Sequence, residues 1–365
     1  MCRHRLSIDQ VMPSIMSKKN FYAEHVHQER IDNYSRYLPA YQKRVAKELG
    51  FFGWSLRDLK GKKIIDFGSG LQSVVFAQAG ADRVFHFDIS DRQVERLRDY
   101  TRRQGVKNIE TKVSDLDEDV LDFPAFDFSF MLGVFHHLAR PENSLLALLS
   151  SCNADGSLYF RVYRAGTWSR WLVEQLRTLS ALTSINHIKE AYLRDRGNVI
   201  LGTFLEDMVD DLFTEILSAY HLSDFQRVAD RLDLGFHSPD VETPTGFSAL
   251  DENFRFLFHK RSENNDYSAI SVSPSAYSEV PRSIDLARSI KIEIDDLKNA
   301  MATRDSKLNA LTLVDLYRLV RSEKGYPDLF RANMVPQVDV SVSEATLGDA
   351  RVRSLMYLLK FWKSL

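Results

Sequence analysis

A short apolar strand that runs through an acidic residue into a Gly-x-Gly turn constrains the fold of this chain more than any other feature. The strand and turn are residues 64–70, Ile-Ile-Asp-Phe-Gly-Ser-Gly. Strand-like runs recur after it, and helical stretches such as residues 91–103 and 142–152 lie between most of them. Strands that alternate with helices predict a parallel sheet with right-handed crossovers. A ligand then binds at the carboxyl end of the first strand, where Gly68 and Gly70 let the backbone approach it closely.

Four further strand-like runs follow up to residue 164, and they are residues 83–89, 108–114, 126–133 and 157–164. A last strand pair is predicted at residues 236–242 and 253–260, separated by a turn that contains Pro and Gly. All these strands belong to the predicted sheet.

The rest of the chain divides into helical parts and one linker. Apolar residues at helical spacing over 28–49 predict an N-terminal helix, and residues 1–26 show no clear period. A Ser- and Asn-rich stretch after Arg261 predicts a linker. Removal of everything after Arg261 is therefore expected to leave the ligand site folded. The predicted parts are an N-terminal helical segment (1–60), a ligand-binding core (61–165), a helical insert (166–223), the last strands of the core (224–261), the linker (262–281) and a helical C-terminal extension (282–365) with helices at 283–302, 311–322 and 350–365.

Composition excludes several classes of protein. The 365-residue chain has a formal net charge of -2, so it lacks the excess of positive charge that attracts nucleic acid, and no nucleic-acid partner is predicted. Its two cysteines, Cys2 and Cys152, exclude a disulfide framework and a cysteine-rich zinc site. His25 and His27 have no third ligand nearby, so no metal site is predicted. The sequence lacks both a signal-peptide core and a run of about 18 apolar residues, which predicts a cytoplasmic protein without a membrane span.

Three more strand ends complete a candidate nucleoside site. Asp88 ends an apolar strand, and its carboxylate can accept hydrogen bonds from both hydroxyls of a ribose. After the next strand, Asp115 can accept from an adenine amino group while Leu116 packs on the ring. The fourth strand ends at Leu132 and Gly133, whose carbonyl oxygens can hold an ammonium group.

Two classes of cofactor use a turn of this kind. A dinucleotide needs the third glycine of Gly-x-Gly-x-x-Gly for close helix packing, and Ser73 occupies that position here. S-adenosylmethionine carries no phosphate and has a cationic amino end, which Asp66 is placed to meet directly or through water. The turn therefore favours S-adenosylmethionine over a dinucleotide.

Taken in order and spacing, these motifs resemble those of the class I S-adenosylmethionine-dependent methyltransferases, most closely the small-molecule group typified by ubiquinone and menaquinone biosynthesis enzymes. The motifs are Ile-Asp-Phe-Gly-Ser-Gly at 65–70, Phe-Asp-Ile at 87–89, Ser-Asp-Leu at 114–116 and Phe-His-His-Leu-Ala-Arg-Pro-Glu at 135–142. The resemblance leaves out residues 166–215 and everything beyond about 262. It implies an α/β, Rossmann-like sheet of seven mostly parallel strands with an antiparallel last strand. The cofactor-binding residues that it implies are Asp66, Gly68, Ser69, Gly70, Asp88, Ile89, Ser114, Asp115, Leu116, Leu132 and Gly133.

Fewer residues are candidates for catalysis or for binding a substrate. Methyl transfer needs mainly alignment and exclusion of water, so a base is required only for a protonated acceptor. His136 and His137 follow the fourth strand and are either a general base or a structural pair at a helix start. Arg161, Tyr163 and Arg164 end the fifth strand and can hold an acidic substrate group, although a structural ion pair is the alternative for Arg161.

The resemblance implies methyl transfer to an unidentified small-molecule acceptor, with the helical insert as a lid over it. One alternative is methylation of a protein or RNA that the C-terminal helices recruit. Another is a non-catalytic cofactor-binding protein that acts through those helices. The amphipathic pattern over 352–365 favours a docked helix or an interface over a membrane surface. A homo-oligomer or a protein partner through residues 282–365 is therefore an expected assembly.

Overall fold

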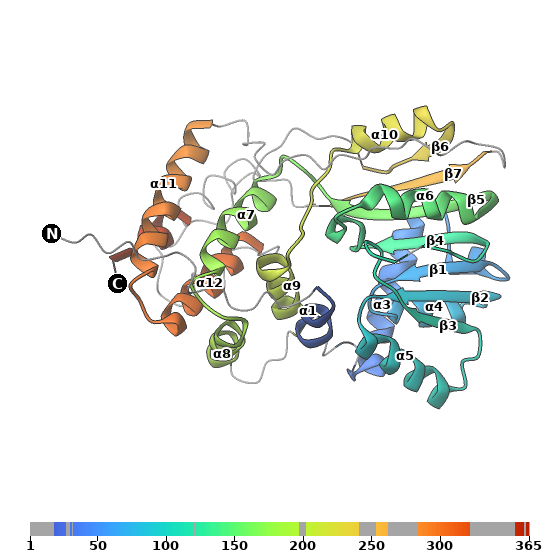
Figure 1. The fold of residues 1–365 in the computed structure, drawn as a ribbon, viewed down its shortest axis with the longest axis horizontal. Coiled ribbons are helices and arrows are strands. Elements are labelled where there is room, and N and C mark those ends of the chain that lie inside the picture. Colours follow the sequence, from blue (N-terminus) through green and yellow to red (C-terminus); the bar gives the residue numbers. More distant parts are fainter. Residues whose placement is uncertain are drawn as a thin grey trace, which may run out of the picture.

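In the computed structural model, a twisted sheet with helices on both faces stands beside a layer made of helices alone (Figure 1). The structure describes residues 18–26, 30, 32–119, 121–196, 202–240, 253–261, 284–321, 355–360 and 363–364. The predicted linker 262–281 lies outside the described residues, as does the whole stretch from 322 to 354.

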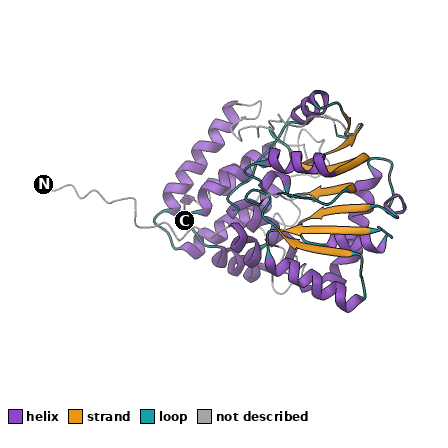
Figure 2. Ribbon diagram, turned by 45° about the vertical axis from the view of Figure 1, so that its right-hand side comes forward, coloured by secondary structure: helices purple, strands orange, loops and turns teal. Residues whose placement is uncertain are grey.

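The sheet has the strand order β3-β2-β1-β4-β5-β7-β6. Neighbours from β3 to β5 pair in parallel, and β7 is antiparallel to both of its neighbours. This confirms the predicted seven-stranded sheet and its antiparallel last strand. Figure 2 shows the twist that L-amino acids impose on such a sheet. The strands are β1 (Lys63–Phe67), β2 (Arg83–Asp88), β3 (Ile109–Val113), β4 (Phe126–Leu132), β5 (Cys152–Tyr163), β6 (Leu234–His237) and β7 (Asn253–Lys260).

Helices cover the two faces of the sheet because the parallel strands are apolar on both sides. On one face α3 (Tyr34–Gly50), α4 (Leu71–Gln78) and α5 (Asp91–Gln104) share an apolar cluster with the sheet. On the other face α6 (Pro141–Ser151) and α10 (Leu222–Arg231) do the same.

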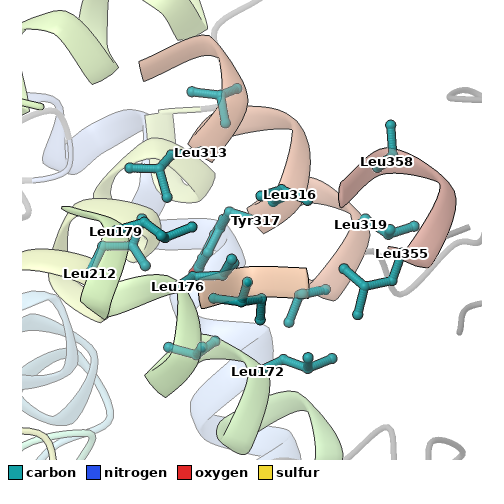
Figure 3. Close-up of a cluster of buried hydrophobic side chains, with 14 of the residues drawn as sticks. Leu172, Leu176, Leu179, Leu212, Leu313, Leu316, Tyr317, Leu319, Leu355 and Leu358 are labelled. Atoms are coloured by element: carbon teal, nitrogen blue, oxygen red, sulfur yellow. The ribbon is translucent and has the colours of Figure 1, made fainter. Parts of the chain in front are cut away.

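The insert and the C-terminal extension form one helical layer, which we call the helical cap. It consists of α7 (Trp168–Ser180), α8 (Ile185–Arg196), α9 (Gly202–Phe213), α11 (Ile284–Met301), α12 (Ser306–Arg321) and the helical residues 355–360. Leucines from α7, α9, α12 and 355–360 meet in one buried cluster (Figure 3). The sequence treated insert and extension as separate parts, whereas the structure packs them around a common core.

A helix that the sequence did not predict, α1 (Lys18–His25), lies between the sheet and the cap (Figure 1). Phe21 of α1 and the following Val26 pack on Val209 of α9. Arg30 continues the link, because its guanidinium contacts the carboxylates of Glu206 and Asp207. The N-terminal segment therefore joins the two layers.

Two strand boundaries differ from those predicted. β5 begins at Cys152 rather than at residue 157. Its pairing with β4 shifts register between Phe126 and Phe128, and this irregularity accommodates the extra residues of β5. β6 is short and begins at Leu234. Of the helices that the structure describes, none combines the length and the apolar run that a bilayer crossing needs.

Candidate functional site

A pocket with an empty volume of about 600 Å³ opens where β1, β2, β3 and β4 end. Parallel strands bring their carboxyl ends to one edge of the sheet, so motifs far apart in the sequence meet here. Seven of the predicted cofactor residues line the pocket, and they are Gly68, Asp88, Ile89, Ser114, Asp115, Leu116 and Gly133. Asp66, Ser69, Gly70 and Leu132 are not among the lining residues.

Asp66 lies beneath the pocket rather than on its wall. Its side chain is fully buried, and Oδ2 accepts a 2.6 Å hydrogen bond from the Ser73 hydroxyl. The strand register places Asp66 beside His86, whose Nδ1 is 3.1 Å from the same hydroxyl. Asp66 does not line the pocket, and its predicted contact with the cationic end of a cofactor, directly or through water, stays a prediction. Asp66 fixes the first turn of α4 against the sheet.

The Gly-x-Gly turn has the backbone geometry that the pattern predicts. Gly68 and Gly70 have φ values of 101° and 75°, in the left-handed region that favours glycine. The Tyr34 hydroxyl donates a 2.9 Å hydrogen bond to the carbonyl oxygen of Ser69 between them. A Cβ on Gly70 would lie 2.8 Å from a methyl carbon of Leu97. The turn is thus held by packing from α3 and α5 as well as by its own glycines.

We expect Gly70→Ala to destabilise the protein by about 2–4 kcal/mol, because left-handed strain and an overpacked contact add together. Gly105→Ala is the matched control, since Gly105 also has a positive φ of 67° but has open space around the new Cβ. Chemical denaturation measures both free energies of unfolding. Equal losses in the two variants would contradict the packing argument.

Two carboxylates are held in the same way at neighbouring strand ends. Asp88 accepts a hydrogen bond from the backbone N–H of Ser90 at 2.6 Å. Asp115 accepts one from the N–H of Asp117 at 3.0 Å. Each is an Asx turn, in which the side chain bonds to the backbone two residues on. Both carboxylates are therefore oriented in advance at the wall of the pocket.

Helix α1 covers the β3 end of this pocket. The Lys18 ammonium donates a hydrogen bond to Asp117 and lies 3.9 Å from the Asp115 carboxylate. Burial tends to raise the pKa of Asp117, but hydrogen bonds from Lys18 and from the N–H groups of Arg140 and Ala139 outweigh it and hold that pKa below its usual value. An ionised Asp117 thus anchors α1 over the pocket.

His137 reaches the pocket from the short helix η3 (Phe135–His137) and meets α9 of the cap. Its Nδ1 is 3.0 Å from the carbonyl oxygen of Ile216, and its Nε2 is 3.3 Å from Oδ2 of Asp210. Tyr22 lies beside it with the two rings edge to face. Both ring nitrogens of His137 therefore face oxygen atoms of the protein.

The other predicted catalytic and substrate residues lie outside the pocket lining. His136 is buried and stacks on the Tyr163 ring at a centroid distance of 3.6 Å. Burial and the neighbouring His137 hold the pKa of His136 well below its usual value. Arg161 lies 3.5 Å from Glu48, and Arg164 lies 4.0 Å from Asp240. These contacts correspond to the structural ion pair that was the alternative for Arg161.

Sequence reasoning missed eight residues of the pocket, which are Lys18, Tyr22, Phe67, Phe87, Gln93, Val134, Leu138 and Asp210. Phe67 and Phe87 sit inside the quoted motifs, so the motifs themselves could have indicated them. Lys18 and Tyr22 lie in a stretch without hydrophobic period, and nothing local signals that it folds back over the sheet. In the sequence Asp210 stands with Asp211 between the apolar residues Val209 and Leu212, and acidic residues in an apolar helical stretch were a usable signal. Among the described residues, no group of three or more potential ligands is placed to hold a metal ion.

Comparison with known proteins agrees with the motifs. A family model described as a methyltransferase domain matches residues 65–156, which cover β1 to the start of β5. The ribosomal protein L11 methyltransferase of Tolumonas auensis is 42% identical over 53 residues. That match spans 14% of this chain and 18% of that enzyme.

Solved structures resemble this chain at low identity. The YcgJ protein from Bacillus subtilis is 12% identical with a TM-score of 0.40, over 59% of this chain and 99% of that one. Magnesium protoporphyrin IX methyltransferase from Synechocystis PCC 6803, solved with bound SAH, is 15% identical with a TM-score of 0.39, over 66% of this chain and 97% of that one.

Proposed function

We propose that this chain, which carries a class I S-adenosylmethionine-dependent methyltransferase domain, transfers a methyl group from that cofactor to a small-molecule acceptor. One observation carries the proposal. The carboxylates of Asp88 and Asp115 meet Gly68 and Gly133 in a single pocket at the strand ends. This is the set of groups that a nucleoside with a cationic amino-acid tail requires.

The chemistry of the lining fits the cofactor. The Asp88 carboxylate would accept from the ribose hydroxyls, and Asp115 from the adenine amino group, with Leu116 against the ring. Gly68 and Gly133 leave room for the methionine part beside the ends of β1 and β4. When bound, the cofactor supplies an activated methyl group on a sulfonium, so the protein has mainly to align the acceptor and exclude water.

The cover of the pocket supports a small acceptor. Tyr22 and Lys18 come from α1, and Asp210 comes from α9, so two helices outside the sheet close over the strand ends. A small molecule fits beneath such a cover more easily than a folded protein does. The short match to a ribosomal protein methyltransferase favours protein methylation as the second candidate. Methyl-labelled cofactor, incubated with metabolite and protein fractions in parallel, tests one class against the other.

Asp88→Ala is expected to weaken binding of S-adenosylmethionine by about 1–3 kcal/mol, because it removes hydrogen bonds to a charged acceptor. That loss corresponds to roughly 5-fold to 150-fold in the dissociation constant, which isothermal calorimetry measures. Asp91→Ala is the control, since Asp91 is exposed and pairs with Lys19 outside the pocket. Unchanged affinity in Asp88→Ala would remove Asp88 from the ribose contact.

The direct test of the proposal is calorimetric titration of the wild-type protein with S-adenosylmethionine, S-adenosylhomocysteine and NAD. We expect binding of the first two and none of NAD. Binding of NAD alone would overturn the proposal, because it would make the Gly-x-Gly turn a dinucleotide site despite Ser73.

A further inference from the structure

The carboxylate of Asp210 has one oxygen engaged and one oxygen without a partner. Oδ2 is 3.3 Å from Nε2 of His137. Oδ1 is buried and makes no hydrogen bond within the part of the chain that the structure describes. Asp210 also lines the pocket, with its side chain 15% exposed. A buried acceptor atom left without a donor is costly, so a ligand that brings a donor to Oδ1 gains that energy.

Asp210 lies at the β4 side of the pocket. The sheet order places β3 and β4 on opposite sides of β2 and β1, so Asp115 and Gly133 mark the two ends of the site. His137, which contacts Asp210, follows β4 by only a few residues. Asp210 is therefore at the end away from Asp115, which in the proposed function is the end where the methionine part and the acceptor meet.

The neighbours of Asp210 are poorly suited to take a proton from an acceptor. Burial, together with the Asp210 charge, raises the pKa of Tyr22 well above its usual value, so Tyr22 stays a neutral phenol. Nδ1 of His137 must donate to the Ile216 carbonyl, because a carbonyl oxygen only accepts, and Nε2 already faces Asp210. His136 lies outside the pocket lining and stacks on Tyr163.

We propose that Asp210 is the catalytic base of this chain and that the acceptor presents an O–H or N–H group to its free Oδ1. The inference rests on the proposed methyltransferase function and narrows its substrate class to acceptors that are protonated at the methylated atom. As the acceptor atom bonds to the methyl carbon and the carbon–sulfur bond breaks, the acceptor proton passes to Oδ1. The products are the methylated acceptor, the neutral thioether and a protonated carboxyl group.

His137 acts as a positioning residue in this arrangement. Its Nδ1 donates to the Ile216 carbonyl oxygen, and its Nε2 lies 3.3 Å from Oδ2 of Asp210, so the ring is fixed against the carboxylate. The contact through Oδ2 holds the carboxylate at the wall of the pocket and leaves Oδ1 without a hydrogen bond among the described residues. Asp210 belongs to α9. The helical cap therefore contributes a reacting group to the pocket at the strand ends of the sheet.

Sinefungin tests the inference without any acceptor. In this cofactor analogue a carbon that bears an amino group replaces the methyl-bearing sulfur, so its ammonium lies where the methyl group would. We expect the wild-type protein to bind sinefungin about tenfold more tightly than S-adenosylhomocysteine, through a charge-assisted hydrogen bond to Oδ1. Asp210→Asn should abolish that advantage and leave the affinity for S-adenosylhomocysteine unchanged. Calorimetry measures the four affinities.

Asp207→Asn, one turn earlier on α9, is the matched control, because Asp207 is half exposed and pairs with Arg30 outside the pocket. It should keep the preference for sinefungin. Thermal melting of each variant checks that the cap stays folded. A preference that survives in Asp210→Asn, or no preference in the wild-type protein, would overturn the inference while the proposed function stands. Failure of the wild-type protein to bind S-adenosylhomocysteine would overturn both.

Discussion

Removing residues 282–365 is expected to unfold the helical cap while the sheet keeps its secondary structure. The apolar cluster of the cap is shared between the insert and the C-terminal extension (Figure 3). Among the described residues, fifteen buried members of that cluster lie between Ala287 and Leu359. Each such side chain contributes about 1–3 kcal/mol when buried, so their loss exceeds the 5–15 kcal/mol that stabilises a typical domain.

The unfolding of the cap should reach the pocket. Tyr317 of α12 donates a 2.6 Å hydrogen bond to Asp211 of α9, the residue next to Asp210. α9 also packs on α1, whose Lys18 and Tyr22 cover the strand ends. The sequence-based expectation was that a chain ending at Arg261 keeps a folded ligand site. The structure leads to the opposite expectation for the cover of that site.

Hydrogen exchange of the shortened chain measures this effect. Fast exchange in α7, α8 and α9, with protection kept in β1, β4 and β5, is the expected pattern. Ile294→Ala makes the same test in the full chain. Because Ile294 is fully buried, the change should lower the free energy of unfolding by about 2–5 kcal/mol. Ile292→Ala on the same helix is the control, since Ile292 is 55% exposed. Protection of α7 to α9 in the shortened chain would show that the insert folds alone.

Local patterns were enough to predict the sheet. Period and turn residues identified the seven strands, and the glycines at 68 and 70 identified the turn because its positive φ values favour glycine. The pocket residues that follow β1, β2, β3 and β4 were predictable because strand ends of a parallel sheet must meet at one edge.

The cover of the pocket depends on contacts between distant residues, which no local pattern encodes. Lys18 pairs with Asp117, and His137 pairs with Asp210, across large separations in the chain. The burial of Asp66 has a related cause. Its strand was right, but the neighbouring Ser73 and His86 turn its carboxylate into the layer under the turn. Side-chain direction at a strand end is set by such neighbours rather than by the motif.

The second large effect is expected for Asp211→Ala, which should destabilise the protein by about 3–5 kcal/mol. Asp211 is buried on α9 and forms a two-bonded ion pair with Arg170 of α7, at 2.9 and 3.2 Å. The hydroxyls of Tyr163 at the end of β5 and of Tyr317 on α12 also donate to it. One carboxylate thus joins the sheet, the insert and the extension.

The size of the effect follows from what the change leaves behind. Among the described residues Arg170 is the largest fully buried side chain, and its guanidinium lies 3.8 Å from the centre of the Tyr163 ring. Without Asp211 this buried charge loses the ion pair with that carboxylate, and two hydroxyls lose the hydrogen bonds that they donate to it. Asp211→Asn should cost less, because the amide oxygen still accepts one hydrogen bond.

Urea denaturation of the wild-type protein, Asp211→Ala and Asp211→Asn measures their free energies of unfolding, with Asp295→Ala as the control. Asp295 pairs with Lys291 on the surface of α11, where such a pair contributes about 0–1 kcal/mol. A double variant of Asp211→Ala with Arg170→Met also removes the buried guanidinium and should recover part of the stability. If Asp211→Ala were no more destabilising than Asp295→Ala, the buried pair would not hold the cap to the sheet. The route by which the C-terminal helices support Asp210 would then have to run through apolar packing alone.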